Sequence, residues 1–356
     1  MSAGQPRSAP RSRSERRAVP GRRGGINLGG TKIQAIVVDP DSVVLGQARR
    51  PTPTGGGPPA VVAAMAAALA EAADAAETPT DSLTGVGVGS PGAVDAEQGI
   101  VAQARNLPDW DEPFPVGSAL SESLGTRVVL GNDVQAATIA EHRLGAGASY
   151  RSLLGVFWGT GVGGGLILDG RPWTGRGAAG EIGHTVVRRG GARCPCGRTG
   201  CLEAYAGRGA MEAAARRAVR RGVDTRLFSI MEKRGHDRLT SGIWARALRH
   251  HDPLAHKLID RAIEALGCGI ASAVNLLDVE AVVVGGGLGV RFGEKGVRRV
   301  EQAMAPHLFV DSRPPAVHVA ALGDLSGALG AALLVGERAA RRAPARRRTP
   351  RRPTGS

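Results

Sequence analysis

A cluster of metal-binding residue types constrains the fold of this chain more than any other sequence feature. His184, Cys194, Cys196 and Cys201 fall within eighteen positions and include three of the four cysteines in the chain. Three cysteines and one histidine are a common ligand set for a closed, tetrahedral zinc site. The Pro-Cys-Gly run around Cys196 supplies the tight turn that two thiolates one residue apart need to bind one ion. The sequence therefore predicts a structural Zn²⁺ held by these four side chains.

Two other interpretations of the cysteines are a chance cluster of buried thiols and a disulfide. A disulfide between any two of the three would leave the third unpaired. Cys268 lies in an apolar helical pattern, so we expect it to pack in a core. A zinc ion with four protein ligands has no open position for catalysis. Its expected role is to hold a loop that presents Glu181 and Glu203, which bracket the cluster.

The formal charge of +14 on 356 residues belongs almost entirely to the two ends of the chain. Residues 1–25 carry a net charge of +6 and residues 341–356 carry +7, which leaves +1 for everything between. Both ends mix Arg with Pro, Ser, Gly and Ala, which predicts disordered basic tails at 1–24 and 341–356. Such tails could contact phosphates weakly. Because no aromatic residue is interleaved to stack on bases, we expect no specific nucleic-acid partner.

The sequence also predicts the compartment. No apolar run approaches the roughly 18–20 residues that span a bilayer, so no membrane association is expected. The basic start of the chain is not followed by the apolar segment of a secretory signal, whereas an organelle transit peptide stays possible. Clustered thiols used as metal ligands are typical of a reducing compartment. The expected location is the cytoplasm.

Short apolar strands alternate with helix-forming segments along the chain, which predicts an α/β fold. Strands are expected within 26–39 and at 86–88, 127–130, 153–158, 166–168 and 281–284; helices are expected at 60–77, 134–144 and 324–339 and over most of 203–274.

Hydrophobic strands run into glycine-rich turns near residues 29, 159 and 285. Such turns let backbone N–H groups approach phosphate oxygens that a Cβ atom would obstruct. Any one of these turns alone favours a plain hairpin, but three of them, two with a threonine, favour a nucleotide held between two domains. The chain lacks the P-loop motif, and it has no Gly-x-Gly-x-x-Gly between a strand and a helix. The phosphate site is therefore expected to be of another kind.

In their order along the chain, these motifs resemble the ROK family of sugar kinases, and the overall likeness is to bacterial glucokinases. The resemblance covers residues 25 to about 340 and is most specific in the cysteine motif. The matching motifs are Leu28-Gly29-Gly30-Thr31-Lys32, Asn132-Asp133, Gly159-Thr160-Gly161-Val162-Gly163-Gly164-Gly165, Gly180-Glu181-Ile182-Gly183-His184 and Cys194-x-Cys196-Gly-x-x-Gly-Cys201-Leu-Glu203.

The resemblance implies a two-domain, actin-like α/β fold with an interdomain cleft and a zinc-held loop. Its implied parts are an N-terminal domain at 25–133, a C-terminal domain with the zinc motif at 134–323, and a helix at 324–340 that returns to the first domain. The implied activity is ATP-dependent phosphorylation of a hexose, most nearly glucose to glucose 6-phosphate. The implied cofactors are ATP, Mg²⁺ and structural Zn²⁺, and a homodimer or homotetramer is expected.

Phosphoryl transfer to a sugar hydroxyl requires a group that accepts the hydroxyl proton. Asp133 is the candidate base, because it lies where a strand turns into a helix and its carboxylate can point into a cleft. From position alone, a helix N-cap is an equal alternative; the family resemblance favours the base. The expected sugar-binding residues are Ser90, Pro91, Gly92, Asn106, Asn132, Asp133, Glu181, His184 and Glu203. The expected nucleotide-binding residues are Gly29, Gly30, Thr31, Lys32, Thr160, Gly161, Gly286 and Gly287.

Asn27 departs from the family pattern, which usually has Asp before the first glycine pair. Mg²⁺ prefers carboxylate oxygens, so an amide here predicts a weaker or more Mg²⁺-dependent activity. One alternative function is therefore a non-catalytic sugar-sensing regulator, and the family also contains repressors. We expect no repressor here, because about 25 residues before the first glycine pair leave no room for a DNA-binding module. Other candidate sugars are N-acetylglucosamine, N-acetylmannosamine and fructose.

Overall fold

The computed structural model describes residues 21–104, 107 and 109–342. Asn106 lies outside the described residues, as does most of both predicted tails. The first strand begins at Arg23, slightly before the expected start of structure. Its first residues are held there because Gly24 pairs with Val37 and Val86, and because the Arg23 guanidinium donates to the backbone oxygen of Pro40.

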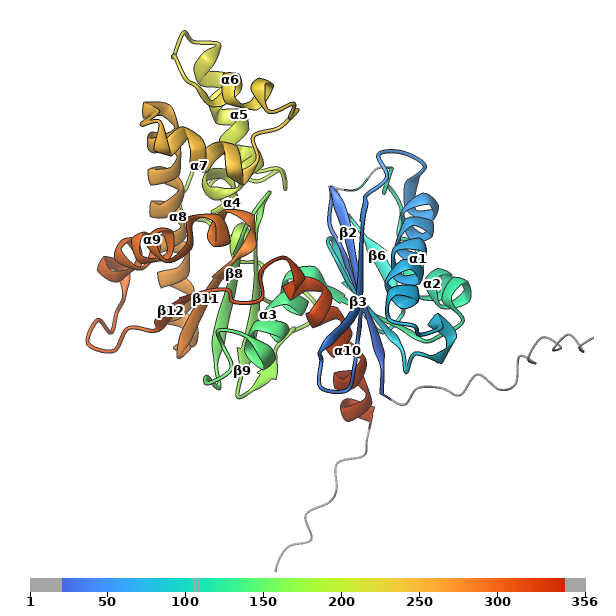
Figure 1. The fold of residues 1–356 in the computed structure, drawn as a ribbon. Helices are drawn as coiled ribbons and strands as arrows, with labels where there is room; N and C mark the ends of the chain where they lie inside the picture. Colours follow the sequence, from blue (N-terminus) through green and yellow to red (C-terminus); the bar gives the residue numbers. More distant parts are fainter. Residues whose placement is uncertain (1–20, 105–106, 108, 343–356) are drawn as a thin grey trace, which may run out of the picture.

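The first lobe is built on a five-stranded sheet with the strand order β3-β2-β1-β4-β7 (Figure 1). The first three strands are antiparallel neighbours, whereas β4 and β7 run parallel to β1. The carboxyl ends of β1, β4 and β7 therefore meet at one edge. The elements are β1 (Arg23–Leu28), β2 (Lys32–Val38), β3 (Val44–Pro51), α1 (Gly57–Ala75), η2 (Thr80–Ser82), β4 (Val86–Ser90), β5 (Ala93–Asp95), β6 (Ile100–Ala102), α2 (Val116–Leu124) and β7 (Val128–Asn132).

The second lobe is built on a second five-stranded sheet with the order β10-β9-β8-β11-β12. Alternate residues of β8 and β11 face two different cores, because side chains in a strand alternate between the two faces of the sheet. One face packs on α9 and the other on α3. Its strands are β8 (Leu153–Trp158), β9 (Val162–Leu168), β10 (Arg171–Pro172), β11 (Ala281–Gly285) and β12 (Ala316–Val319). Its helices are η3 (Ile182–His184), α4 (Glu203–Ala206), α5 (Arg208–Val219), α6 (Leu227–Lys233), α7 (Ser241–Arg249), α8 (Pro253–Leu277), α9 (Gly286–Met304) and η4 (Ala305–His307).

Two helices join the lobes, and Figure 1 shows them between the sheets. The helix α3 (Asp133–Leu144) packs on β8 and β9, whereas α10 (Ser326–Arg342), which follows η5 (Gly323–Leu325), packs on β1 and β4. The two helices pack closely against each other. Small residues make this possible: a Cβ at Gly330 of α10 would lie 1.7 Å from the backbone oxygen of Ala136 of α3.

The glycine run after β8 forms both a turn and the start of a strand, which corrects the expectation that the strand begins at Leu166. Strand β9 begins at Val162 rather than at Leu166, so only residues 159–161 form the turn. Gly163 and Gly165 lie within β9, where added Cβ atoms would lie 2.6 Å from Val134 and 2.3 Å from Thr138 of α3. These glycines therefore let α3 approach the sheet.

Helix α1 corrects the expectation that no apolar run approaches the length of a membrane span. By length and composition alone it is long and apolar enough to cross a membrane, because its alanine-rich run is interrupted only by two acidic residues. Val61, Met65 and Leu69, however, are fully buried in the core of the first lobe. The helix packs along β2 and β3. It is accordingly a core helix of this fold.

Candidate functional site

The carboxyl edge of the first sheet brings several predicted residues together. In register, Asn27 pairs with Gly89, and Ser90 pairs with Asn132. A Cβ atom at Gly89 would lie 3.2 Å from the Cα of Asp133 and 3.6 Å from Oδ1 of Asn27. Asn27 and Asp133 therefore flank the same glycine. Gly89 leaves the space between them open, because a larger residue would fill it.

Asn132 and Asp133 lie at the N-terminus of α3 and make different contacts there. Oδ1 of Asn132 accepts from the N–H groups of Val134 and Gln135, both at 3.0 Å, so Asn132 is the N-cap. The alternative that made Asp133 the N-cap is wrong. Asp133 is the first helical residue, and one of its oxygens accepts from Val134 at 2.9 Å.

The environment of Asp133 suits a proton acceptor. Burial raises the pKa of Asp133 to about 6, and the negative charge of Glu181 adds to the rise. The backbone N–H groups of Val134 and of Asp133 itself oppose it. A carboxyl with such a pKa is ionised at neutral pH and holds a proton more readily than an exposed aspartate.

The four predicted metal ligands converge on one point. Their ligand atoms all lie within 4.8 Å of one another. Sγ of Cys196 is 3.8 Å from Sγ of Cys201, and Sγ of Cys194 is 3.8 Å from Nδ1 of His184. Zn–S bonds of about 2.3 Å at tetrahedral angles place two sulfurs roughly 3.8 Å apart. The cluster therefore fits Zn²⁺. The same distance is too long for a disulfide bond, which contradicts that alternative.

The metal cluster lies directly beside both predicted glutamates. Oε2 of Glu203 accepts from the N–H of Val162 at 2.9 Å, and its Oε1 is 4.0 Å from Sγ of Cys194. Nε2 of His184 points away from the sulfurs and is 4.0 Å from Oε2 of Glu181. The nitrogen of His184 that faces the cluster, Nδ1, is therefore distinct from the nitrogen that faces Glu181, Nε2. A bound metal would fix that tautomer.

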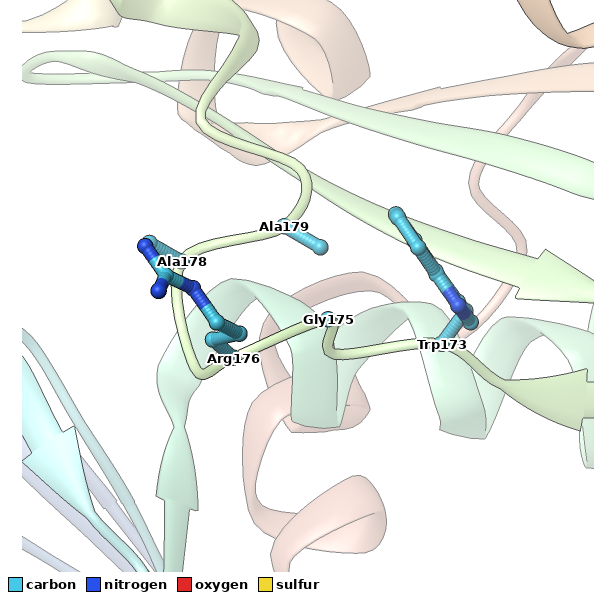
Figure 2. A pocket seen from close by; sticks show the side chains of 5 residues that line it. All are labelled: Trp173, Gly175, Arg176, Ala178 and Ala179. Carbon is cyan, nitrogen blue, oxygen red and sulfur yellow. The ribbon is translucent and has the colours of Figure 1, made fainter.

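A shallow pocket lies in the loop that leads to Glu181. Figure 2 shows Trp173 and Arg176 on opposite sides of this loop, with Ala179 between them. Gly175 turns the chain with φ of +54°, which brings Ala179 and the Trp173 ring close to it. The Trp173 side chain is 48% exposed. The residues that line this pocket are not among the predicted site residues.

The first glycine turn is a hairpin between β1 and β2. Gly30 and Thr31 are exposed, and the turn is closed by a bond from Gly29 N–H to the oxygen of Lys32. Nζ of Lys32 pairs with Oδ2 of Asp324 at 2.9 Å, and this contact lowers the pKa of Asp324. Sequence reasoning missed Asp324, because 292 positions of chain separate it from Lys32 and nothing local signals the pairing.

The other two glycine turns lie next to each other in the second lobe. A Cβ at Gly159 would lie 3.8 Å from the N–H nitrogen of Gly287, and a Cβ at Gly286 would lie 2.6 Å from the backbone oxygen of Trp158. Gly286 has φ of +77°, which favours glycine. Gly161 is packed for a different reason, because a Cβ there would lie 2.2 Å from Oε2 of Glu203.

Comparison with known proteins decides the family. The family model described as "ROK family" matches residues 23–338. The chain belongs to the ROK family. Among curated relatives, a glucokinase of Thermotoga maritima is 33% identical over 321 residues, which are 88% of this chain and 97% of that protein. An N-acetylgalactosamine kinase of a Shewanella species is 32% identical over 319 residues, 87% of this chain and 95% of that protein.

A solved structure supports the same fold. The ROK glucokinase of Streptomyces griseus, solved with glucose and AMPPNP, superposes with a TM-score of 0.77 at 31% identity and covers 89% of this chain and 100% of that one. The predicted two-domain, actin-like kinase fold is confirmed. In this ROK protein the residues predicted to bind sugar lie at the carboxyl ends of β4 and β7 and beside the His/Cys cluster, whereas the glycine turns lie at the ends of β1, β8 and β11.

Proposed function

We propose that this ATP-dependent hexose kinase converts glucose to glucose 6-phosphate. The observation that carries the proposal is the position of Asp133, whose pKa of about 6 suits a general base and which lies beside Asn132 at the start of α3. Its raised pKa reflects a site from which water is partly excluded. The likeness to glucokinases over nearly the whole chain supports glucose as the substrate.

Each residue near Asp133 has a role in this proposal. Asp133 accepts the proton of the attacking sugar hydroxyl as the bond to phosphorus forms. The side-chain N–H₂ of Asn132 donates to the sugar, because its oxygen is already used by the helix. Glu181, His184 and Glu203 hold other ring hydroxyls. The loop of Ser90, Pro91 and Gly92 lines the same side, with Gly92 at φ of +86°.

The phosphate groups of ATP are proposed to contact the backbone of the three glycine turns. The proposed contacts are Gly29, Gly30, Thr31, Lys32, Thr160, Gly161, Gly286 and Gly287. Mg²⁺, when bound to ATP, would neutralise charge on the phosphates, and Asn27 is the side chain of this chain placed to orient its water shell. Zn²⁺ held by His184 and the three cysteines is proposed to fix the loop that carries Glu181 and Glu203, with no part in proton transfer.

Further parts of the proposal are the expected domain boundaries at 25–133, 134–323 and 324–340, a cytoplasmic location and a homodimer or homotetramer. The relatives differ in the sugar they are named for, since one is named for N-acetylgalactosamine, so the preferred sugar is a matter for experiment. A non-catalytic sugar-sensing regulator is the second candidate, and Asn27 is the observation that favours it. Asp133 and its pKa argue for catalysis.

The test is an ADP-release assay across glucose, fructose, mannose, N-acetylglucosamine, N-acetylmannosamine and N-acetylgalactosamine, with ATP and Mg²⁺. We expect the highest kcat/KM with glucose. A higher value with an N-acetylated sugar would overturn the substrate assignment and keep the kinase. Sugar binding by calorimetry with no ADP release for any sugar would favour the regulator.

A further inference from the structure

Arg208 lies at the nucleotide side of the site, at the start of α5. Its guanidinium donates to two hydroxyl groups, that of Thr160 at 2.8 Å and that of Ser241 at 3.3 Å. Thr160 belongs to the glycine turn after β8, and Ser241 begins α7. Arg208 thus connects three segments that are far apart in sequence, and it does so at the turn proposed to contact phosphate.

The backbone around Arg208 is fixed to that same turn. The N–H of Arg208 donates to the oxygen of Gly159 at 3.1 Å, and the N–H of Gly209 donates to the oxygen of Thr160 at 3.0 Å. A Cβ at Gly287, the second residue of α9, would lie 3.0 Å from Oγ of Ser241. The guanidinium, the Thr160 turn and the start of α9 therefore form one rigid group.

Arg208 lacks a carboxylate partner within 4.0 Å among the residues that the structure describes. The neighbouring Glu212 is committed elsewhere, because its Oε1 pairs with Arg216 at 2.6 Å and its Oε2 accepts from Leu239 N–H at 3.0 Å. Burial lowers the pKa of Arg208. The negative charge of Glu212 raises it in part, and the positive charge of Arg238 has the smallest effect and lowers it. A half-buried guanidinium whose hydrogen bonds go to neutral hydroxyls, and whose neighbouring carboxylate is bonded to other groups, is stabilised further when an anion binds to it.

We propose that Arg208 binds the phosphate chain of the nucleotide donor, and that the Thr160 and Ser241 hydroxyls position its guanidinium. The inference rests on the proposed function and deepens it, because it adds a side chain to a phosphate site otherwise made of backbone. Arginine suits this role, since its planar fork can donate two parallel hydrogen bonds to phosphate oxygens. The neutral hydroxyls orient the fork without neutralising its charge.

The experiment compares binding of ADP, AMPPNP and adenosine by calorimetry in the full-length protein and in Arg208→Gln. Hydrogen bonds to charged groups contribute enough that we expect the Kd of ADP and AMPPNP to rise about 10- to 100-fold. The Kd of adenosine and the Kd of glucose should change less than about twofold. Arg208→Lys keeps the charge and loses the planar fork. Its Kd values for ADP and AMPPNP should lie between those of the parent protein and those of Arg208→Gln.

The matched control is Arg217→Gln, which removes an exposed arginine from the same helix and should leave all three affinities unchanged. Thermal melting of each variant reports folding. Equal weakening of adenosine and ADP would overturn the inference, because it would assign Arg208 a purely structural role in the turn. Unchanged ADP binding would overturn it too. These measurements need no turnover, so they stay interpretable if the sugar assay contradicts the proposed kinase activity.

Discussion

The proposed sugar-binding side and the proposed nucleotide-binding side of the site are built differently. On the proposed sugar-binding side, side chains are already held in place: Asn132 caps α3, Glu203 accepts from Val162 N–H, and four candidate metal ligands converge within 4.8 Å. On the proposed nucleotide-binding side, the groups are mainly the backbone of glycine turns, with Arg208 as the proposed additional side chain. Sugar stereochemistry needs oriented side chains, whereas phosphate can be bound by any correctly shaped backbone.

Replacing the proposed base should have the largest effect. Asp133→Asn should lower kcat by about 10² to 10⁴, the usual contribution of a positioned general base, with little change in the Kd of glucose. The variant should be more stable than the parent at pH 7. The raised pKa means that ionised Asp133 destabilises the fold above that pKa, and Asn never ionises. A variant that retains most of its kcat would remove Asp133 from the mechanism.

Removing the metal should disturb the proposed sugar-binding side alone. We expect about one Zn²⁺ per chain in reduced protein, and loss of it should lower kcat/KM for glucose by about 10², because displacement of a positioning group by roughly 1 Å has such an effect. Cys201→Ser should lose zinc, and Cys268→Ser, which alters the cysteine outside the cluster, should keep it. The Kd of ADP should not change. Absence of zinc from the freshly purified protein would contradict the metal assignment.

Two glycines of the turn after β8 allow a steric test of the proposed sugar-binding side. Gly161→Ala places a methyl group 2.2 Å from Oε2 of Glu203, whereas Gly159→Ala meets its nearest atom at 3.8 Å. Because Glu203 has to move, the first change should raise the KM of glucose about tenfold or more. The second should leave it within about twofold. Similar glucose KM values for the two variants would show that Glu203 is not a sugar contact.

The pH dependence of kcat/KM tests the proposed base in the unaltered protein. Because burial raises the pKa of Asp133 to about 6, kcat/KM should fall roughly tenfold per pH unit below that value, as the base becomes protonated. Above it the rate should level off. Asp133→Asn should lose this acid limb. If its residual activity shows the same limb, another group is responsible.

Restoring a carboxylate at Asn27 should have the smallest effect. Asn27→Asp should lower the Mg²⁺ concentration for half-maximal rate by a few-fold, since negative charge attracts a divalent cation in a partly dehydrated site. Calorimetry of ADP binding with and without Mg²⁺ gives a second readout. A remote control is Asn275→Asp on α8, which should leave the Mg²⁺ dependence unchanged. Weaker Mg²⁺ binding in Asn27→Asp would show that the surroundings are adapted to a neutral side chain.

Local sequence signals located most elements correctly. The expected helices at 134–144 and 324–339 correspond to α3 and α10, and the expected strand at 281–284 corresponds to β11. The signals failed where one residue type has two uses. The expected strand began at Leu166, which left Gly163 and Gly165 in the turn before it, but both lie in β9, and α3 packs against them. A run of glycines reads the same in the sequence whether it forms a turn or a strand that packs closely on a helix, so only the packing partner tells the two apart.

The sequence by itself predicted the α/β fold class and the four side chains that converge as candidate metal ligands, because strand–helix alternation and ligand spacing are local properties. It also indicated Asp133 as a candidate base, which stays a prediction. Tertiary structure alone decided that Asn132 is the cap of α3 and that Lys32 pairs with Asp324. It also placed Arg208 between Thr160 and Ser241 without a carboxylate partner in the described part of the chain. The physical reason is that a side chain's charge state and partners depend on segments brought close by folding, and no local pattern records them.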